Sequence, residues 1–178
     1  FHPSWWTEVQ AVGQRKSYDD HANDSRVGEG SVALAWHRLS WLELRGTGSK
    51  RWTRYDRRQQ YSSAGRELDG TILRIDEREL EARGDITWDR TAQWRSSTAV
   101  GLMHYRDNGP GYFNYREQKV DQDVEWKNDL WLLRVGGTAS RFDYGVRKVG
   151  LGIDPPARVK DEFTASLNGE RRVGLRWT

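Results

Sequence analysis

The sequence lacks three features that would place it in familiar classes of protein. It has no cysteine, which excludes disulfide bridges and thiolate chemistry and is compatible with a periplasmic or outer-membrane location. No apolar run approaches the eighteen or so residues that a membrane-spanning helix needs. The net charge of +3 is too small to imply a strong field for nucleic acid. The composition therefore disfavours disulfide scaffolds, helical membrane proteins and nucleic-acid binders.

The chain is instead rich in charge and in aromatic rings. Charged residues make up 31% of it and the mean hydropathy is −0.94, as in a water-soluble protein. These values also suit a membrane β-barrel, in which only alternate residues face lipid. Ten Trp and seven Tyr are too many for a disordered chain. We expect one β-barrel domain over residues 1–178, which stands alone or forms the C-terminal membrane domain of a longer protein.

The stretch from Phe163 to Thr178 alternates apolar or small residues with polar ones. This period of two predicts a β-strand, because successive side chains point to opposite faces. The stretch exceeds the usual five or six residues of a strand, roughly, and suits a tilted membrane-crossing strand. Arg171 falls on the apolar side, so we expect a bulge near Gly169 or an arginine side chain that extends to the membrane interface.

The same alternation recurs in seven earlier stretches. The predicted strands cover 5–15, 32–37, 42–49, 79–88, 94–105, 120–127, 131–140 and 163–178. The facing of 94–105 stays open, since Val100 and Leu102 compete with Ala99, Gly101 and Met103 for one face. Long loops over 16–30, 50–70 and 144–161 alternate with tight turns, as in outer-membrane barrels with short periplasmic turns. We therefore predict an all-β fold, a closed antiparallel up-and-down eight-stranded transmembrane β-barrel.

Tryptophan gathers where the tight turns are predicted. The expected interfacial aromatic belt at that end comprises Trp5, Trp36, Trp88, Trp94, Trp126, Trp131 and Trp177. Several tyrosines fall at the opposite rim, and Trp52 is the exception to the pattern. Trp and Tyr prefer the bilayer interface because their rings are apolar and their tips are polar. The alternative is a soluble β-sandwich with Trp at its strand ends, but a sandwich needs apolar inward faces.

The second face of the predicted strands carries acidic and basic residues together. The expected lumen network comprises Glu8, Glu43, Arg45, Glu81, Arg83, Asp85, Asp123, Glu125, Arg134 and Arg172. The lumen of an eight-stranded barrel is only wide enough for side chains to fill it. We expect these residues to form an ion-pair network that plugs the barrel, and the alternative is a narrow proton or ion path.

The pattern over the whole chain resembles the small eight-stranded outer-membrane β-barrels of Gram-negative bacteria, the class of the transmembrane domain of outer-membrane protein A. The most specific match is Arg172-Val173-Gly174-Leu175-Arg176-Trp177-Thr178. It resembles the terminal insertion signal of that class, without the final aromatic residue. The resemblance implies a location in the bacterial outer membrane and insertion by the barrel-assembly machinery.

Residues suited to catalysis or metal binding are few. His104 lies where a lipid-cleaving barrel could place a catalytic histidine, but its same-face neighbour at position 106 is Arg rather than a nucleophile. His21 lies near Asp19, Asp20 and Asp24 in a polar loop. This group could ligate a metal ion, but a solvated loop accounts for the same residues. We predict no catalytic set, no metal site and no cofactor.

A basic cluster in the second long loop offers a contact for anions. Arg51, Arg54, Arg57 and Arg58 could bind lipopolysaccharide phosphates, which arginine contacts in bidentate fashion. A solvated loop tip explains the cluster equally well. Nucleic acid is not an expected partner, because no stacking platform accompanies the charge.

Three functions remain open from the sequence. The first is a structural, anchoring or envelope-complex role in the outer membrane, with the bilayer, lipopolysaccharide and other envelope proteins as partners. The second is a lipid A- or phospholipid-modifying barrel enzyme. The third is a narrow, porin-like pore or a segment of a larger export barrel. We favour the first, because no catalytic set emerges and the lumen is expected to be filled.

Overall fold

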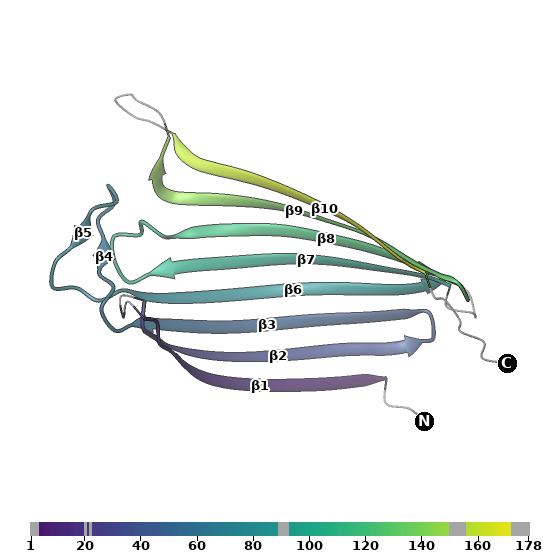
Figure 1. Cartoon of the computed structure of the whole chain (residues 1–178). Helices are drawn as coiled ribbons and strands as arrows, with labels where there is room; N and C mark the ends of the chain where they lie inside the picture. Colours follow the sequence, from purple (N-terminus) through teal and green to yellow (C-terminus); the bar gives the residue numbers. More distant parts are fainter. Residues whose placement is uncertain (1–3, 20, 22, 89–92, 150–155, 172–178) are drawn as a thin grey trace.

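The protein folds almost entirely into β-strands (Figure 1). The computed structural model describes residues 4–19, 21, 23–88, 93–149 and 156–171. The strands within this part are β1 Trp5–Lys16, β2 Ser25–Leu39, β3 Leu42–Tyr55, β4 Gln60–Tyr61, β5 Glu67–Leu68, β6 Arg74–Trp88, β7 Trp94–Asp107, β8 Tyr115–Lys127, β9 Trp131–Lys148 and β10 Ala157–Arg171. No helix in the described residues is both long and apolar enough to cross a membrane.

Eight of the strands form one antiparallel up-and-down sheet in the order β1-β2-β3-β6-β7-β8-β9-β10. The short strands β4 and β5 form a separate hairpin within the connection from β3 to β6. The predicted all-β class, strand count and up-and-down order are thus confirmed. We call the end with the β2–β3, β6–β7 and β8–β9 connections the turn end, and the opposite end the loop end.

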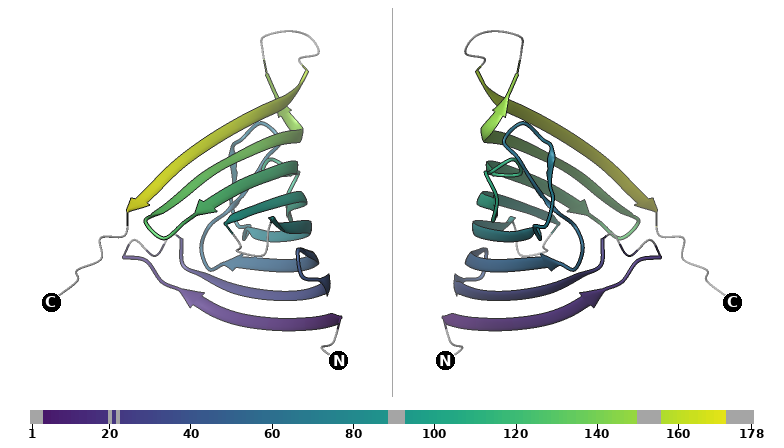
Figure 2. Two further views of the ribbon diagram at one scale, coloured as in Figure 1. Left: turned by 90° about the vertical axis from the view of Figure 1, so that its right-hand side faces the viewer. Right: turned by 90° about the vertical axis from the view of Figure 1, so that its left-hand side faces the viewer.

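The sheet is curved but open (Figures 1 and 2). Within the described residues, β1 pairs only with β2 and β10 pairs only with β9, so both strands are edges. The predicted closure of these eight strands into a barrel is therefore not observed within the described residues. Periodicity fixes the face of each residue, but the curvature that brings two edges together depends on the packing of the whole sheet.

Several strands extend further into the loops than the sequence predicted. β2 begins at Ser25 rather than at 32, and β3 ends at Tyr55 rather than at 49. The added segments are polar, with Arg15 opposite Arg26 and Arg26 opposite Arg54. Ladder hydrogen bonds do not require apolar side chains, so strands that continue into water escape detection by apolar periodicity.

The register settles two questions that the sequence left open. Val100 of β7 lies opposite Ala82 and Val120, so Val100 and Leu102 share the face of the other large apolar residues. The ladder from β10 to β9 is regular at Gly169, and its only irregularity within the described ladder lies between Ala157 and Val159. The expected bulge near Gly169 is absent there. The guanidinium of Arg171 instead lies 5.6 Å from the centre of the Trp131 ring.

The largest fully buried side chain in the described residues, that of Leu73, lies at the loop end. Leu73 and Ile75 are buried where β6 begins. The turn between β7 and β8 is organised by Asp107, whose carboxylate accepts hydrogen bonds from the backbone amides of Gly109, Gly111 and Phe113. Gly111 has a φ of 94°, which a residue with a side chain rarely adopts.

Candidate functional site

The two faces of the sheet differ completely in character. One face, which we call the apolar face, carries every second residue of each strand. It includes Val9, Val32, Leu80 and Leu102, which lie opposite one another in a single row of the register together with Gly48. Large hydrophobic side chains on this face are exposed, among them Val9, Val32, Leu34, Leu44, Leu80, Val100, Leu102, Val120, Val135, Phe163 and Leu167. Nothing in the described chain covers them. An exposed apolar surface of this extent marks a contact with a partner or a membrane.

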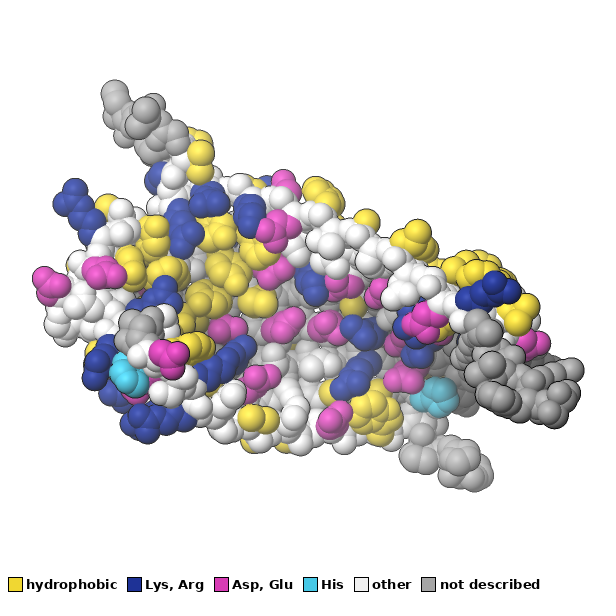
Figure 3. Space-filling view, in the orientation of Figure 1, with side chains coloured by type: hydrophobic (Ala, Val, Ile, Leu, Met, Phe, Trp, Pro, Cys, Tyr) yellow, Lys and Arg dark blue, Asp and Glu magenta, His cyan; other side chains and the backbone are white. Residues whose placement is uncertain are grey.

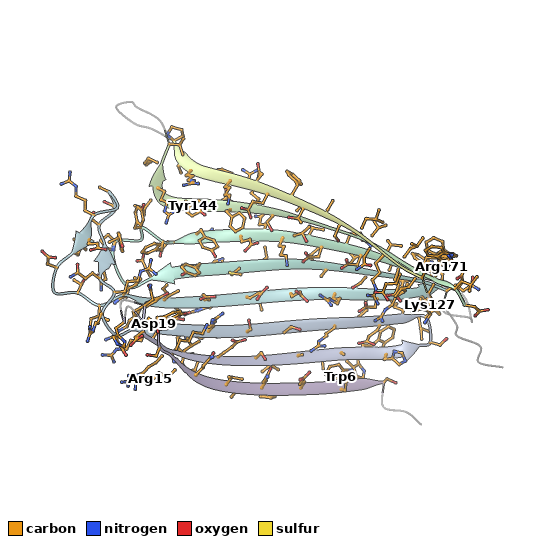
Figure 4. All side chains as sticks on the ribbon, in the orientation of Figure 1. Trp6, Arg15, Asp19, Lys127, Tyr144 and Arg171 are labelled. Atoms are coloured by element: carbon orange, nitrogen blue, oxygen red, sulfur yellow. The ribbon has the colours of Figure 1, made fainter. Side chains whose placement is uncertain are left out.

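The predicted aromatic belt lies on the apolar face at the turn end. The rings of Trp5 and Trp36 are 6.4 Å apart, and those of Trp94 and Trp126 are 6.2 Å apart. Trp88 lies opposite Trp94 in the register. Trp131 lies at the same end, with the guanidinium of Arg171 over its ring. Figure 4 labels Arg171 at this end of the sheet. Trp177 lies outside the described residues. The six tryptophans of this belt that the structure describes form what we call the Trp boundary: Trp5, Trp36, Trp88, Trp94, Trp126 and Trp131.

A second boundary, which the sequence reasoning missed, lies toward the loop end of the apolar face. On six strands a basic residue follows or precedes the Trp by ten positions, and an even interval keeps both on one face. The pairs are Trp5 and Arg15, Trp36 and Arg26, Trp88 and Arg78, Trp94 and His104, Trp126 and Arg116, and Trp131 and Arg141. We call this second set the basic boundary. The constant interval is visible in the sequence, and it could have identified these residues.

The two boundaries run parallel to each other and oblique to the strands. The row of register partners that starts at Trp5 of β1 crosses six strand-to-strand steps and ends at Gly137 of β9. Trp131, the boundary residue of β9, lies six residues nearer the turn end than Gly137. With about 3.4 Å per residue and about 4.8 Å between strands, this offset corresponds to a strand tilt of about 35°. Ten residues at that tilt span a height of about 28 Å between the boundaries. The apolar face is thus a tilted band of constant height.

The opposite face, which we call the polar face, carries ionic side chains (Figure 3). Six of the residues predicted for the lumen network form three ion pairs there. Arg45 lies 3.2 Å from Glu8, Arg83 lies 3.6 Å from Glu81, and Arg134 lies 2.8 Å from Glu125. Because these groups are substantially exposed, each pair contributes only about 0.2–1 kcal/mol.

The other predicted lumen residues have different neighbours. Asp85 pairs with Arg95 at 3.5 Å, and Glu43 lies 3.9 Å from the His37 ring. Asp123 lies beside Gly136. Arg172 lies outside the described residues. The polar face also holds pairs that the sequence reasoning did not select, such as Lys119 with Asp121 at 2.9 Å.

The four arginines predicted to contact lipopolysaccharide do not form one surface. Arg54 lies on the apolar face of β3, opposite Arg26 and Arg74, and so joins the basic residues beyond the apolar band. Arg51 lies on the polar face opposite Glu77, and its Nε is buried without a hydrogen-bond partner. Arg58 stacks on aromatic rings at 5.2 and 5.5 Å, whereas Arg57 is exposed.

An aromatic cluster at the loop end fixes the β4–β5 hairpin against the sheet. The Tyr61 ring stacks on Tyr112 at 5.7 Å and meets the edge of Phe113 at 5.1 Å. The guanidinium of Arg147 lies 4.4 Å from the centre of the Tyr112 ring and 5.1 Å from that of Tyr144. Since these rings and cations already contact one another, the cluster is a packing element.

The two histidines singled out from the sequence have ordinary surroundings. His104 lies on the basic boundary, and its neighbours across the sheet are Arg78 and Arg116, neither of which is a nucleophile. His21 Nδ1 lies 3.0 Å from the Asp24 carboxylate. In the part of the chain that the structure describes, no three His, Asp or Glu side chains converge in a way that could hold a metal ion.

Fold and surface together define an all-β protein built from one amphipathic antiparallel sheet, apolar on one face and ionic on the other. No protein-family model, curated protein or solved structure matches the chain.

Proposed function

We propose that this chain crosses a lipid bilayer as the wall of a bacterial outer-membrane β-barrel and has a structural or anchoring role in the cell envelope. The observation that carries the proposal is the apolar face bounded by Trp on one side and by basic residues on the other, ten residues apart on six strands. Trp is favoured at a bilayer interface, and basic side chains extend to lipid headgroups.

The dimensions of the band match a bilayer. Membrane barrels have strands tilted by about 35–45° and an apolar band about 25 Å tall. The values derived from the Trp5 and Trp131 offset, about 35° and about 28 Å, agree with both. A protein partner would not require a band of constant height across six strands. A bilayer does, because its hydrocarbon core has a fixed thickness.

Basic residues at the loop end of the apolar face support an anionic lipid as the partner. Arg15, Arg26, Arg54 and Arg74 follow one another across four strands at the loop end. Arg15 and Arg26 share the Asp56 carboxylate at 3.8 and 4.0 Å and remain more than half exposed. The four guanidinium groups suit the phosphates of anionic lipids, and on the outer leaflet these belong to lipopolysaccharide. Insertion by the barrel-assembly machinery from the periplasm, with the turn end remaining inside, is part of the same proposal.

A structural role fits the described site better than a lipid-modifying activity does. His104 has Arg78 and Arg116 directly opposite it in the register, and neither is a nucleophile. A lipid A-modifying barrel would change the mass of lipid A in cells that produce the protein, and a phospholipid-modifying one would change the phospholipids. We expect identical lipid A mass spectra with wild-type protein, with H104A and without the protein.

Two adjacent residues of β7 provide a matched test of membrane insertion. Val100 lies near the middle of the band on the apolar face and is 51% exposed, whereas Gly101 points to the polar face opposite Glu81. Arginine on a lipid-facing position at mid-depth costs about 2–4 kcal/mol in a membrane barrel. Arginine at 101 would lie between Glu81 and Lys119 on the solvated polar face, where attraction and repulsion offset each other, and should change stability by less than about 1 kcal/mol.

The experiment compares V100R and G101R in the full chain, refolded into phosphatidylcholine vesicles and titrated with denaturant. We expect V100R to lose most of its vesicle-bound folded fraction and G101R to retain it. In water an exposed valine can be replaced by arginine without loss. Equal behaviour of the two variants, or a wild-type chain that folds without vesicles, would refute the proposal.

A further inference from the structure

The two edges of the sheet carry unsatisfied backbone groups that a bilayer does not tolerate. β1 and β10 are 12 and 15 residues long, and neither has a partner on its outer side within the described chain. No proline interrupts either strand. Each backbone N–H or C=O left unpaired in hydrocarbon costs several kcal/mol, roughly. If the proposed function holds, both edges must therefore be paired in the membrane.

The hydrogen-bonding directions of the two edges match. The amide of His37 bonds the carbonyl of Ser4, so even-numbered residues of β1 bond β2 and odd-numbered ones face the free edge. The amide of Asn128 bonds the carbonyl of Trp131, so odd-numbered residues of β9 bond β8. By alternation, the odd-numbered residues of β10 also face its free edge. Both free sets have their side chains on the apolar face.

One register brings complementary side chains together along these edges. Asp161 and Arg171 of β10 lie opposite Arg141 and Trp131, the two boundary residues of β9. If both boundaries continue from β10 to the next β1, Asp161 lies opposite Arg15 and Arg171 lies opposite Trp5. The same register places Phe163, which is 82% exposed, opposite Gly13, where nothing lies within 4 Å of an added Cβ. The junction thus joins an acid to a base, a guanidinium to an aromatic ring and the highly exposed Phe163 ring to an open position.

The two edges could pair within one copy of the chain or between two copies, and the shape of the sheet favours two copies. β1 and β10 lie at opposite borders of the open sheet (Figure 2). Side chains fill the lumen of an eight-stranded barrel. In the open sheet Glu8 and Arg134 are each 54% exposed, and closure within one copy would bury these charged groups. Sixteen strands enclose a water-filled lumen, which suits hydrated ion pairs.

We propose that β10 of one copy pairs with β1 of a second copy, so that two chains close a sixteen-stranded barrel around an aqueous lumen. The inference rests on the proposed function. It assigns Arg15, Asp161, Phe163 and Gly13 to the junction, which occurs twice under two-fold symmetry.

The cysteine-free chain makes the junction directly testable. In the proposed register Gln10 of one copy lies opposite Ser166 of the other. Both are on the polar face, at a pair without ladder hydrogen bonds, where Cα atoms are closest, about 4.5 Å apart. Q10C chains and S166C chains are refolded together into vesicles, floated, and oxidised. The double variant Q10C/S166C is treated alone, and Q10C with T164C serves as the register control.

We expect the mixture of single variants to give a covalent product of twice the mass, and the double variant to give the same product through two bridges. A double variant that yields only an internally bridged monomer, with no product from the mixture, would overturn the proposal in favour of closure within one chain. No bridge in either sample would also overturn it. Because only floated protein is analysed, membrane insertion itself is scored separately by V100R and G101R.

Discussion

Arg45 of β3 reaches over the whole of β2 to place its guanidinium 3.2 Å from the Glu8 carboxylate of β1 and 5.0 Å from the centre of the Trp6 ring. The contact is possible because β2 presents only small side chains at this point. Ala33 and Ala35 are 4% and 0% exposed beneath it. Three strands of the polar face are thereby linked by one side chain.

Replacing the small residue under Arg45 should break this link. A35L forces a bulky side chain into a filled position, and we expect a loss of about 1–3 kcal/mol in the free energy of unfolding. A11L, on the exposed apolar face of β1, is the matched control and should leave stability nearly unchanged. Denaturant titration of the vesicle-bound protein measures both, and equal stability of the two variants would contradict the packing described.

Gly28 and Trp52 form a second close pair, on the apolar face. A Cβ on Gly28 would collide with the Trp52 ring, which lies across it, whereas nothing lies within 4 Å of a Cβ on Gly46. We expect G28A to displace the ring and to lower stability by about 1–3 kcal/mol, because the overlap involves rigid aromatic atoms. G46A should be close to neutral. If both alanine variants unfold at the same denaturant concentration, the ring does not occupy this position.

The turn from β7 to β8 should depend on Asp107. Its carboxylate accepts three backbone N–H groups, at 2.9 Å from Gly109, 3.1 Å from Gly111 and 2.8 Å from Phe113. D107A leaves these donors without their acceptor, at a cost of about 1–3 kcal/mol. D129A, at an exposed turn of the opposite end, is the control. Hydrogen exchange should accelerate at those three amides in D107A alone, and unaltered exchange there would be evidence against the turn.

The loop from β1 to β2 should loosen in acid. The Tyr18 amide donates to the Asp24 carboxylate at 2.7 Å and, together with His21 and Ser17, holds the pKa of that carboxyl below its ordinary value of 3.8. A lowered folded-state pKa gives stability that is present above the ordinary value and is lost as the pH falls through the lowered one. We expect protection of the Tyr18 amide, corrected for intrinsic exchange, to fall in that acid range. In the D24N variant, the corrected protection of the Tyr18 amide should be independent of pH over the same acid range.

Alternation of residue type predicted much of the fold, because one face of most strands is mainly apolar. It placed eight strands, their order and the facing of residues such as Leu44 and Val135 correctly. It did not find the ends of β2 and β3, since Arg26 and Arg54 are paired by their backbones in a polar setting. It also gave no information on curvature, which is why the open edges of β1 and β10 came only from the structure.

The candidate site was predictable to a similar degree. The Trp boundary follows from residue type and position, whereas the basic boundary needs a measured interval such as that between Trp94 and His104. The ion pairs are harder to foresee. Arg45 finds Glu8 two strands away rather than a neighbour, and that choice depends on the size of Ala35 rather than on charge.

Contact of the apolar face with lipid is the central claim, and site-directed spin labelling along β7 tests it most directly. Single cysteines at 97 to 103, each carrying a nitroxide, are compared for collisions with lipid-soluble oxygen and with a water-soluble nickel chelate. The account predicts strong alternation, with oxygen dominant at Thr98, Val100 and Leu102 and the chelate dominant at Ser97 and Gly101. Chelate accessibility that is equally high at Val100 and Leu102 would contradict it.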